Sequence, residues 1–593
     1  RRNFLGDATV DLGLAGRDLT LAGLDDLAVA DLLDLIGRNS GAIEGAGDGD
    51  ATEFCGVDGG ESAAHLAEGC AGGAQDDGAG HVAFQVARGI RGIGRNEAEY
   101  GRYRLSRLRR MKAYPTDVAL SELDADLVAV GLFEGDELSE PLGSTAGSSD
   151  ASGDFKSQVI VYPGKPERVV IIGLGKKEEF TTERARVLGA VSQKALKQVK
   201  GEALAWMLPD APEGIEPGAI AAALVEGAGF AAFEFDRYKS GSDGEEAPPS
   251  LKAVEINTDQ DVGEMVRVGE VIANAGNAAR YLQSLPANEA TPEYLASRAT
   301  EIAEAHDKVT VDVLDREAII KAGMGGLEAV SKGGEHVEPR LITLKYTGKG
   351  EGEKLGLVGK SVTFDTGGIS IKPSAGMHEM KMDMSGGAAV LEAVNAIAEL
   401  DLPLDIIAVL PSTENMPSGT ALKPGDIITQ LNGKTVEVTN TDAEGRLILA
   451  DALVHCAREG ADRMIDLATL TGAVLIGLGS TYAALICNDD ELAGQIERAA
   501  ERTGELAWRL PLHDEYKNLT KGEITDLVNA SAQRKAGTIY AGSFLEEFTE
   551  GKPWAHLDIA GTAWDTGREY WGKGPTGFGV HLLVALARDL SVA

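Results

Sequence analysis

The chain has 593 residues, a formal net charge of −37 at pH 7, and a hydrophobic fraction of 43%. That length indicates several domains, and the hydrophobic fraction is typical of globular proteins with a packed core. The excess of acid disfavours broad electrostatic binding to nucleic acids or to anionic membranes. Because no run of 18 or more apolar residues occurs, we expect no membrane span.

The four cysteines give no sign of a disulfide framework or of a thiolate zinc site. They stand at positions 55, 70, 456 and 487, and none belongs to a Cys-x-x-Cys pair. The first residues also lack the apolar region and small-residue cleavage site of a signal peptide. We therefore expect a reducing compartment and a cytoplasmic protein.

Residues 1–110 differ in composition from the rest of the chain. They contain no Lys, Met, Pro or Trp, and the first methionine is Met111. We interpret this stretch as a mis-annotated extension, translated from sequence upstream of the true start. The alternative is a genuine but disordered tail. The basic run at 102–112 is not interpreted as a nucleic-acid-binding arm.

Two α/β domains are predicted after this stretch. In the first, residues 111–265, strands at 126–132, 159–162 and 169–173 alternate with helices at 182–199 and 221–233. Residues 241–250, rich in Gly, Glu, Ser and Pro, are predicted to form a loop.

The second domain, residues 270–593, is predicted to be a mixed sheet between helices. A helix is expected at 269–285, and Thr291 followed by Pro292 is typical of the start of another. The remaining predicted strands are 341–346, 355–364, 405–411, 435–439, 464–467 and 483–487, and the remaining predicted helices are 386–400, 446–459, 490–503 and 579–589.

Several common catalytic motifs are absent from the sequence. It contains neither the His-Glu-x-x-His helix of zinc proteases nor a Gly-x-Ser-x-Gly elbow. Gly359-Lys360-Ser361 resembles the end of a phosphate-binding loop, but Lys354 stands where that motif requires glycine. We exclude a nucleotide site at this position.

Carboxylates in turns are the candidate functional residues. Asp365 follows the predicted strand 355–364 and precedes Gly367-Gly368, a position at which a ligand can approach the backbone. Asp383 precedes the predicted helix at 386, where an ordinary helix cap is the alternative.

The segment 440–446, Asn-Thr-Asp-Ala-Glu-Gly-Arg, is the most informative. Asp442 and Glu444 are two residues apart, so in an extended stretch both side chains point the same way. Capping of the helix that Arg446 opens is again the alternative. Converging carboxylates would repel one another without a cation, and hard divalent cations prefer oxygen ligands.

Residues 358–373, 380–387 and 440–452 resemble the signature segments of the leucyl aminopeptidase family, the cytosol aminopeptidases. The resemblance covers roughly 115–590 and includes shorter matches at 226–228, 235–239, 323–327 and 339–342. Thr366 stands where many members carry Ser. The resemblance implies a smaller N-terminal α/β domain and a larger C-terminal dinuclear-metal peptidase domain, with release of N-terminal leucine and other apolar residues from peptides.

The resemblance also implies a role for each matching residue. Asp365 and Glu444 would bridge two divalent ions, Mn²⁺ or Zn²⁺; Asp442 would complete one site, and Lys360 with Asp383 the other. Lys372 would be the catalytic lysine, and Arg446 would hold a bicarbonate ion. Met380, Thr469, Leu470 and Gly472 would line the substrate site. The resemblance further implies a homohexamer.

These roles agree with elementary chemistry. Lys360 can ligate a metal only as a neutral amine, which requires its pKa to fall from ~10.4 by at least ~3 units, about 4 kcal/mol. A neighbouring divalent cation can supply that shift. Two other functions stay open at this point: a DNA-binding accessory or regulatory protein, which the net charge disfavours, and a non-catalytic scaffold, which the complete set of candidate residues disfavours.

Overall fold

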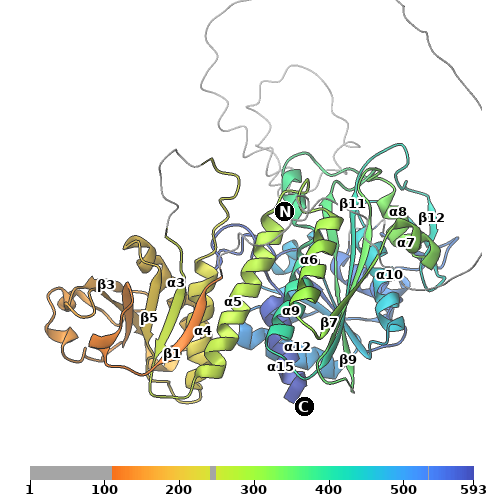
Figure 1. Cartoon of the computed structure of the whole chain (residues 1–593). Helices are drawn as coiled ribbons and strands as arrows, with labels where there is room; N and C mark the ends of the chain where they lie inside the picture. Colours follow the sequence, from red (N-terminus) through yellow and green to blue (C-terminus); the bar gives the residue numbers. More distant parts are fainter. Residues whose placement is uncertain (1–109, 241–248, 351, 532, 534, 593) are drawn as a thin grey trace, which may run out of the picture. The chain divides into compact units, whose positions relative to one another are not determined.

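The computed structural model describes residues 110–593 except 241–248, 351, 532, 534 and 593. The prediction for residues 1–110 lies outside this part of the chain apart from Arg110, as does the predicted loop over most of its length. The described residues all belong to one compact unit. They form two large sheets flanked by helices, which confirms the predicted α/β class (Figure 1).

The first sheet has six strands in the order β1-β6-β5-β2-β4-β3. All neighbouring pairs are parallel except β3 with β4. Every residue of β4 is buried, which is why this strand has the continuous apolar sequence of a central parallel strand. The elements are β1 (Lys112–Thr116), β2 (Leu127–Phe133), β3 (Gln158–Val161), β4 (Val169–Gly175), α3 (Thr182–Gln198), β5 (Ala203–Met207), α4 (Pro217–Ala231) and β6 (Ala253–Asn257).

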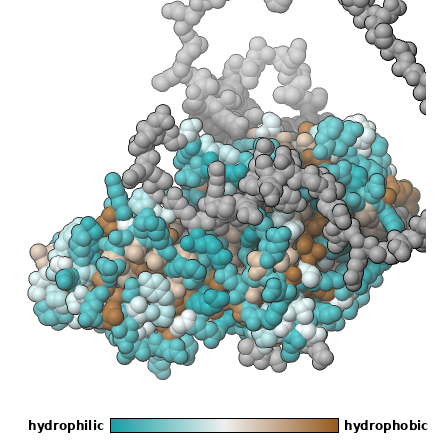
Figure 2. Space-filling view, in the orientation of Figure 1, coloured by the Kyte–Doolittle hydropathy of each residue, from teal (hydrophilic) through white to brown (hydrophobic). Residues whose placement is uncertain are grey.

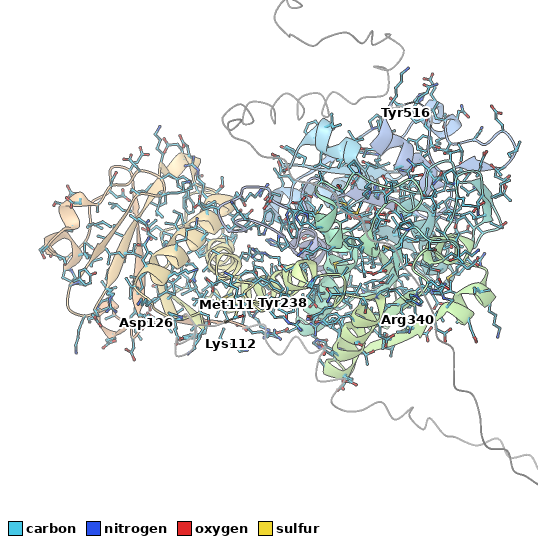
Figure 3. The ribbon with its side chains drawn as sticks, turned by 90° about the horizontal axis from the view of Figure 1, so that it is seen from above. Met111, Lys112, Asp126, Tyr238, Arg340 and Tyr516 are labelled. Atoms are coloured by element: carbon cyan, nitrogen blue, oxygen red, sulfur yellow. The ribbon has the colours of Figure 1, made fainter. Side chains whose placement is uncertain are left out.

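Strand β1 was not predicted, although it pairs along its whole length with β6. It is an edge strand whose residues are mostly exposed, and Pro115 lies within it. Proline is tolerated in a sheet mainly at an edge. Figure 3 shows Met111 and Lys112 at the start of this strand, where the backbone N–H of Met111 donates to Asn274 Oδ1 at 3.1 Å.

The second sheet has nine strands and carries the candidate site. Eight follow the order β16-β15-β18-β14-β9-β11-β8-β7, and β10 pairs in parallel with β11. Its strands are β7 (Val309–Leu314), β8 (Arg340–Thr347), β9 (Lys354–Gly359), β10 (Ser361–Asp365), β11 (Asp405–Asn415), β14 (Arg463–Ala468), β15 (Ala483–Cys487), β16 (Ala507–Arg509) and β18 (Trp554–Asp558). A small third sheet contains β12 (Ile427–Thr429), β13 (Thr435–Glu437) and β17 (Leu527–Val528).

Helices precede, separate and follow the strands of this second sheet along the chain. They are α5 (Gly263–Ser284), α6 (Pro292–Ala305), α7 (Arg316–Ala322), α8 (Gly325–Ser331), α9 (Ser385–Glu399), α10 (Gly445–Arg458), α11 (Gly472–Leu478), α12 (Asp490–Thr503), α13 (Asp514–Asn518), α14 (Gly537–Glu546) and α15 (Val580–Val592). As predicted, the side chain of Thr291 caps α6, whose first residue is Pro292. Helix α5 spans the proposed domain boundary at 265–270 and contacts both α4 and α9.

Two predictions about local structure are wrong, and one of the alternatives is excluded. The strand expected at 355–364 is two strands, β9 and β10, with Lys360 between them. The residue that caps α9 is Met384, so Asp383 is not the cap. Asp442 lies in a turn and Glu444 has helical dihedral angles at the start of α10, so the two acids are not in an extended stretch.

Among the described residues, no helix is both long and apolar enough to cross a membrane. Hydrophilic residues cover most of the coloured face in Figure 2, with hydrophobic residues scattered among them.

Candidate metal centre

Asp365 ends strand β10, and its buried carboxylate is held from two sides. Its Oδ1 accepts hydrogen bonds from the backbone N–H of Gly367 at 2.9 Å and from Asn415 Nδ2 at 2.8 Å. Gly367 has a φ of +84°, and a Cβ built on it would lie 2.7 Å from Asp442 Oδ1. The glycine predicted to allow close approach therefore brings a second carboxylate against this turn.

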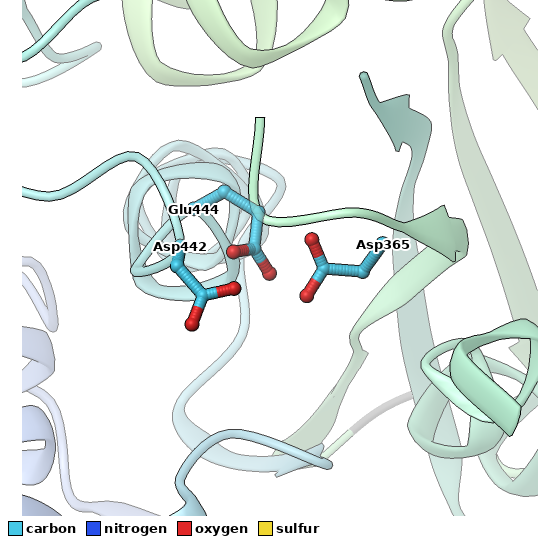
Figure 4. A group of neighbouring side chains, drawn as sticks. All are labelled: Asp365, Asp442 and Glu444. Atoms are coloured by element: carbon cyan, nitrogen blue, oxygen red, sulfur yellow. The ribbon is translucent and has the colours of Figure 1, made fainter. Parts of the chain in front are cut away.

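Asp365, Asp442 and Glu444 form one group. One carboxylate oxygen from each lies within 4.8 Å of the others, and Figure 4 shows the three carboxylates turned toward one another. A turn, rather than an extended stretch, brings Asp442 and Glu444 together. The side chain of Glu444 makes no capping hydrogen bond to α10, so capping does not explain its place.

Lys360 is the amine of the group. Its Nζ lies 2.8 Å from Asp383 Oδ1, 2.9 Å from Glu444 Oε1 and 3.0 Å from the carbonyl oxygen of Thr469. The side chain is 3% exposed, so this is not a solvated surface lysine. Burial lowers the pKa of Lys360, but the carboxylates of Asp383, Glu444 and Asp365 outweigh it and raise the pKa above its ordinary range.

The backbone of Lys360 is fixed as well. Its N–H donates to the carbonyl oxygen of Leu467 on β14 at 3.0 Å, and its carbonyl accepts from the N–H of Gly387 on α9 at 2.8 Å. A Cβ at Gly387 would lie 2.0 Å from Ser361 Oγ, so only glycine allows helix α9 to approach the strand this closely. These contacts set the direction in which the lysine side chain leaves the backbone.

Asp383 belongs to the same group through its contacts rather than as a helix cap. Its Oδ1 accepts from Lys360 Nζ and, at 2.7 Å, from Thr469 Oγ1. Burial raises the pKa of Asp383 to about 8, although Lys360 acts in the opposite direction. Such a shift marks a carboxylate whose charge needs a partner beyond those it has.

Lys372 closes the other side of the group. Its Nζ lies 2.8 Å from Asp365 Oδ2 and also contacts Asp442. Burial lowers the pKa of Lys372, but Asp365, Glu444 and Asp442 raise it above the ordinary lysine value. A raised pKa favours the charged form of this lysine at neutral pH.

The donor set fits a divalent cation. Four carboxylates and one buried lysine nitrogen converge; with that nitrogen in its neutral form, this is the mixed oxygen and nitrogen set that Mn²⁺ and Zn²⁺ accept. In this structure lysine amines are the partners of two further carboxylate oxygens: Lys360 Nζ lies 2.7 Å from Asp383 Oδ2, and Lys372 Nζ contacts Asp442 Oδ1. Burial, with repulsion from Asp365, also raises the pKa of Glu444 and of Asp442. Buried carboxylates with raised pKa values are stabilised in their charged form by a cation among them.

Arg446 lies in the first turn of α10, buried against the ring of Tyr540 at 5.6 Å. One guanidinium nitrogen, Nη1, donates to the carbonyl oxygen of Asn529 at 2.7 Å, whereas Nε is buried without a hydrogen-bond partner. The Nε–H of Arg446 is therefore available to donate a hydrogen bond to a small anion.

The predicted substrate residues lie in two segments near the group. Thr469 contacts both Lys360 and Asp383, and a Cβ on Gly445 would lie 3.0 Å from Leu470 Cδ1. Gly472 is the first residue of α11, and its missing side chain would face open space. Met380, half-buried, lies in the 3-10 helix Met377–Met382 just before Asp383.

Sequence reasoning missed two residues of this region. Asn415 at the end of β11 donates to Asp365, and Asp558 at the end of β18 accepts from the backbone N–H of Leu470 at 3.1 Å. Both end strands of the nine-stranded sheet, as Asp365 does. That shared position is the one signal in the sequence that could have pointed to them.

Comparison with known proteins identifies the family of the chain. Residues 277–584 match the model of the cytosol aminopeptidase family, catalytic domain, and residues 129–242 match that of the N-terminal domain of the same family. The chain is 41% identical over 495 residues to a probable cytosol aminopeptidase of Alkaliphilus oremlandii (strain OhILAs), which covers 79% of this chain and 98% of the relative. A second relative of the same description, from Roseiflexus castenholzii (strain DSM 13941 / HLO8), is 42% identical over 477 residues. The match covers 79% of this chain and 97% of that relative.

Solved structures give the same result. The bottromycin maturation enzyme BotP in complex with Mn is 35% identical, with a TM-score of 0.72, and covers 79% of this chain and all of that one. The K354E mutant of tomato leucine aminopeptidase is 30% identical, with a TM-score of 0.71. The match covers 81% of this chain and 97% of that one. Because the match extends over both family models and nearly the whole length of these relatives, the chain belongs to the cytosol aminopeptidase family, whose members are metal-dependent peptide hydrolases.

Proposed function

We propose that this protein removes N-terminal residues from peptides, preferentially leucine and other apolar residues, with two divalent metal ions. The observation that carries this proposal is the convergence of Asp365, Asp442 and Glu444, with oxygens within 4.8 Å of one another, around the buried amine of Lys360. A second observation is that the members of this group lie at strand ends and in turns, positions that commonly carry functional residues.

The ligands divide between the two ions as the family resemblance implies. Asp365 and Glu444 would be shared, Asp442 would complete one site, and Lys360 with Asp383 would complete the other. The contacts of Lys360 with Asp383 and Glu444 support this division. Ions bound there would supply Lewis acidity and lower the pKa of a bound water.

The chain's own residues would bind and orient the peptide and hold its protons. Lys372, charged beside Asp365 and Asp442, would donate to the scissile carbonyl oxygen as negative charge develops on it. Arg446 stays protonated at neutral pH and cannot be the base, but its unpaired Nε could hold a bicarbonate ion that accepts a proton. Thr469, Leu470 and Gly472 would hold the substrate backbone.

Met380 would form a wall of the pocket for the first side chain. It is half-buried and apolar, which favours a medium-sized apolar residue such as leucine. Initial rates with leucine amide, alanine amide and aspartate amide test this preference, and equal rates for leucine and aspartate would contradict it.

The metal dependence is tested by hydrolysis of leucine amide with added Mn²⁺ and with a chelator. We expect turnover that requires metal, with a content of two ions per chain in the active protein. Glu444→Ala should abolish turnover because it removes a shared ligand. Glu459→Ala, at the other end of helix α10, is the matched control: its carboxylate pairs with Lys345 at 2.6 Å, and full activity should remain. Activity in the Glu444 variant, or turnover unaffected by chelator, would refute the proposal.

The choice between Mn²⁺ and Zn²⁺ depends on supply as well as on ligands. A related enzyme is described in complex with Mn, which makes Mn²⁺ the first ion to test. The homohexamer and the cytoplasmic location stay predictions. Light scattering of the protein as it elutes from a size-exclusion column would check the number of subunits. The named relatives are described as aminopeptidases or as a maturation enzyme, and they give no support to the DNA-binding alternative.

A further inference from the structure

Asn415 lies against two of the carboxylates proposed to be shared by both ions. It is the last residue of β11 and pairs directly with Asp365 in the register between β10 and β11. Its Nδ2 donates to Asp365 Oδ1 at 2.8 Å and to Glu444 Oε2 at 3.4 Å. The residue is 5% exposed, so water does not compete freely for these contacts.

The orientation of this amide is fixed. Its Nδ2 also donates to the carbonyl oxygen of Thr441 at 3.1 Å, so one amino group faces three acceptors. The backbone carbonyl of Asn415 accepts from both the N–H and the hydroxyl of Thr366, at 3.0 and 2.8 Å. A Cβ on Gly368 would lie 2.7 Å from Asn415 Oδ1, which shows how closely the chain packs on the amide oxygen.

Each of the two carboxylates is thus held from opposite sides. Asp365 directs Oδ1 to Asn415 and Oδ2 to Lys372 at 2.8 Å. Glu444 directs Oε2 to Asn415 and Oε1 to Lys360 at 2.9 Å. Asn415 is the one neutral partner that these two carboxylates share among the contacts described.

We propose that Asn415 is a positioning residue for the metal centre, which it serves by fixing the planes of Asp365 and Glu444 without contributing charge. This inference rests on the proposed function, since it takes both carboxylates as ligands. A lysine at 415 would add a positive charge that competes with the ions, and an aspartate would bring a further negative charge against two carboxylates. A primary amide can donate hydrogen bonds to both acids without adding a positive or a negative charge. Partners that orient ligands in this way commonly affect metal affinity.

The test measures Mn²⁺ binding directly, by competition with a chromophoric chelator on protein first stripped of metal. Asn415→Leu keeps the approximate volume and removes the donor, and we expect its Mn²⁺ affinity to fall about 10- to 100-fold. Asn415→Thr keeps one donor and should show an intermediate affinity. Asn395→Leu is the matched control, because Asn395 also donates to a carboxylate, Glu392 at 3.0 Å, but on helix α9; its Mn²⁺ affinity should equal that of the wild type.

The outcomes separate this inference from the proposed function. If the wild type binds no Mn²⁺, the proposed function fails. If the wild type binds Mn²⁺ and both Asn415 variants bind it within twofold as well, the inference is overturned while the function stands. Thermal unfolding of each variant shows whether it is folded, and if Asn415→Leu is not, the result with Asn415→Thr decides: affinity equal to the wild type overturns the inference, and reduced affinity supports it.

Discussion

The carboxylate of Asp558 accepts a hydrogen bond of 2.6 Å from the hydroxyl of Thr471, and both side chains are buried. The same carboxylate accepts from the backbone N–H groups of Leu470 at 3.1 Å and of Ala560 at 3.2 Å. Asp558 therefore connects the end of β18 to the segment that is proposed to hold the substrate backbone.

We expect Asp558→Ala to weaken substrate binding more than it slows the chemical step. The variant leaves buried N–H groups without an acceptor, at a cost of about 1–3 kcal/mol each, and frees the segment around Leu470. For leucine amide, KM should rise roughly 10-fold or more, with a smaller change in kcat. Steady-state kinetics over a range of substrate concentrations measures both. An unchanged KM would contradict the proposed role of this segment.

Asp451→Ala is the comparison variant for Asp558→Ala, and we expect it to change the stability of the fold and not KM. Asp451 is also a buried aspartate that accepts backbone N–H bonds, from Gly326, Leu327 and Leu431 at 2.8, 3.0 and 2.8 Å. Asp451→Ala should lower the free energy of unfolding by about 1–3 kcal/mol for each N–H left unpaired, since α8 loses its acceptor. KM of the folded variant should not change. Urea denaturation, with kinetics on the same samples, checks both statements.

Lys372→Met should reduce kcat strongly while KM changes little. The lysine is proposed to donate to the oxygen that gains charge only as the reaction proceeds, and loss of such a donor typically lowers kcat by about 10²- to 10³-fold. Lys423→Met, which removes an exposed lysine paired with Asp426 at 2.9 Å, should leave kcat unchanged. A rise in KM at constant kcat would instead indicate a role in ground-state binding.

His556 and Asp466 predict a pH dependence of stability. His556 Nδ1 lies 2.6 Å from Asp466 Oδ1, and both are fully buried. Burial lowers the pKa of His556, but Asp466 outweighs it and the pKa is raised above 6.5. A raised pKa in the folded state means that the charged pair stabilises the fold fully below the unfolded value of ~6.5 and that this contribution is lost as the pH rises through the folded value.

His556→Gln removes this titration. The loss of unfolding free energy relative to the wild type should therefore be larger at pH 5.5 than at pH 9. Denaturant unfolding of both proteins across this interval measures the difference. A difference independent of pH would mean that His556 does not become charged in the folded protein.

Much of the candidate metal centre could be predicted from the sequence because its parts are local. Asp365 beside Gly367, and Asp442 beside Glu444, are recognisable in short segments, and the structure brings them together. Asn415 could not be found in this way, since its importance depends on the pairing of β10 with β11, fifty positions apart in the sequence. A single asparagine at the end of a strand has no pattern of its own.

The fold was predictable where burial leaves a continuous apolar run, as in β4. It was not predictable where tertiary contacts override the local pattern. β1 is mostly exposed and contains Pro115, so only its pairing with β6 reveals it as a strand. The run at 355–364 is apolar throughout except near Lys360, and nothing local shows that the chain divides there into two strands.

The two backbone hydrogen bonds of Lys360, to Leu467 and from Gly387, limit how this position can be engineered. Because β14 and helix α9 hold the peptide groups of this residue on both sides, a shorter side chain at 360 could not be compensated by a shift of the main chain. Attempts to change the metal preference by placing histidine or aspartate there should lose the ion instead of exchanging it. Directed evolution for a new metal would do better to vary the neighbours that orient the carboxylates and to leave this amine in place.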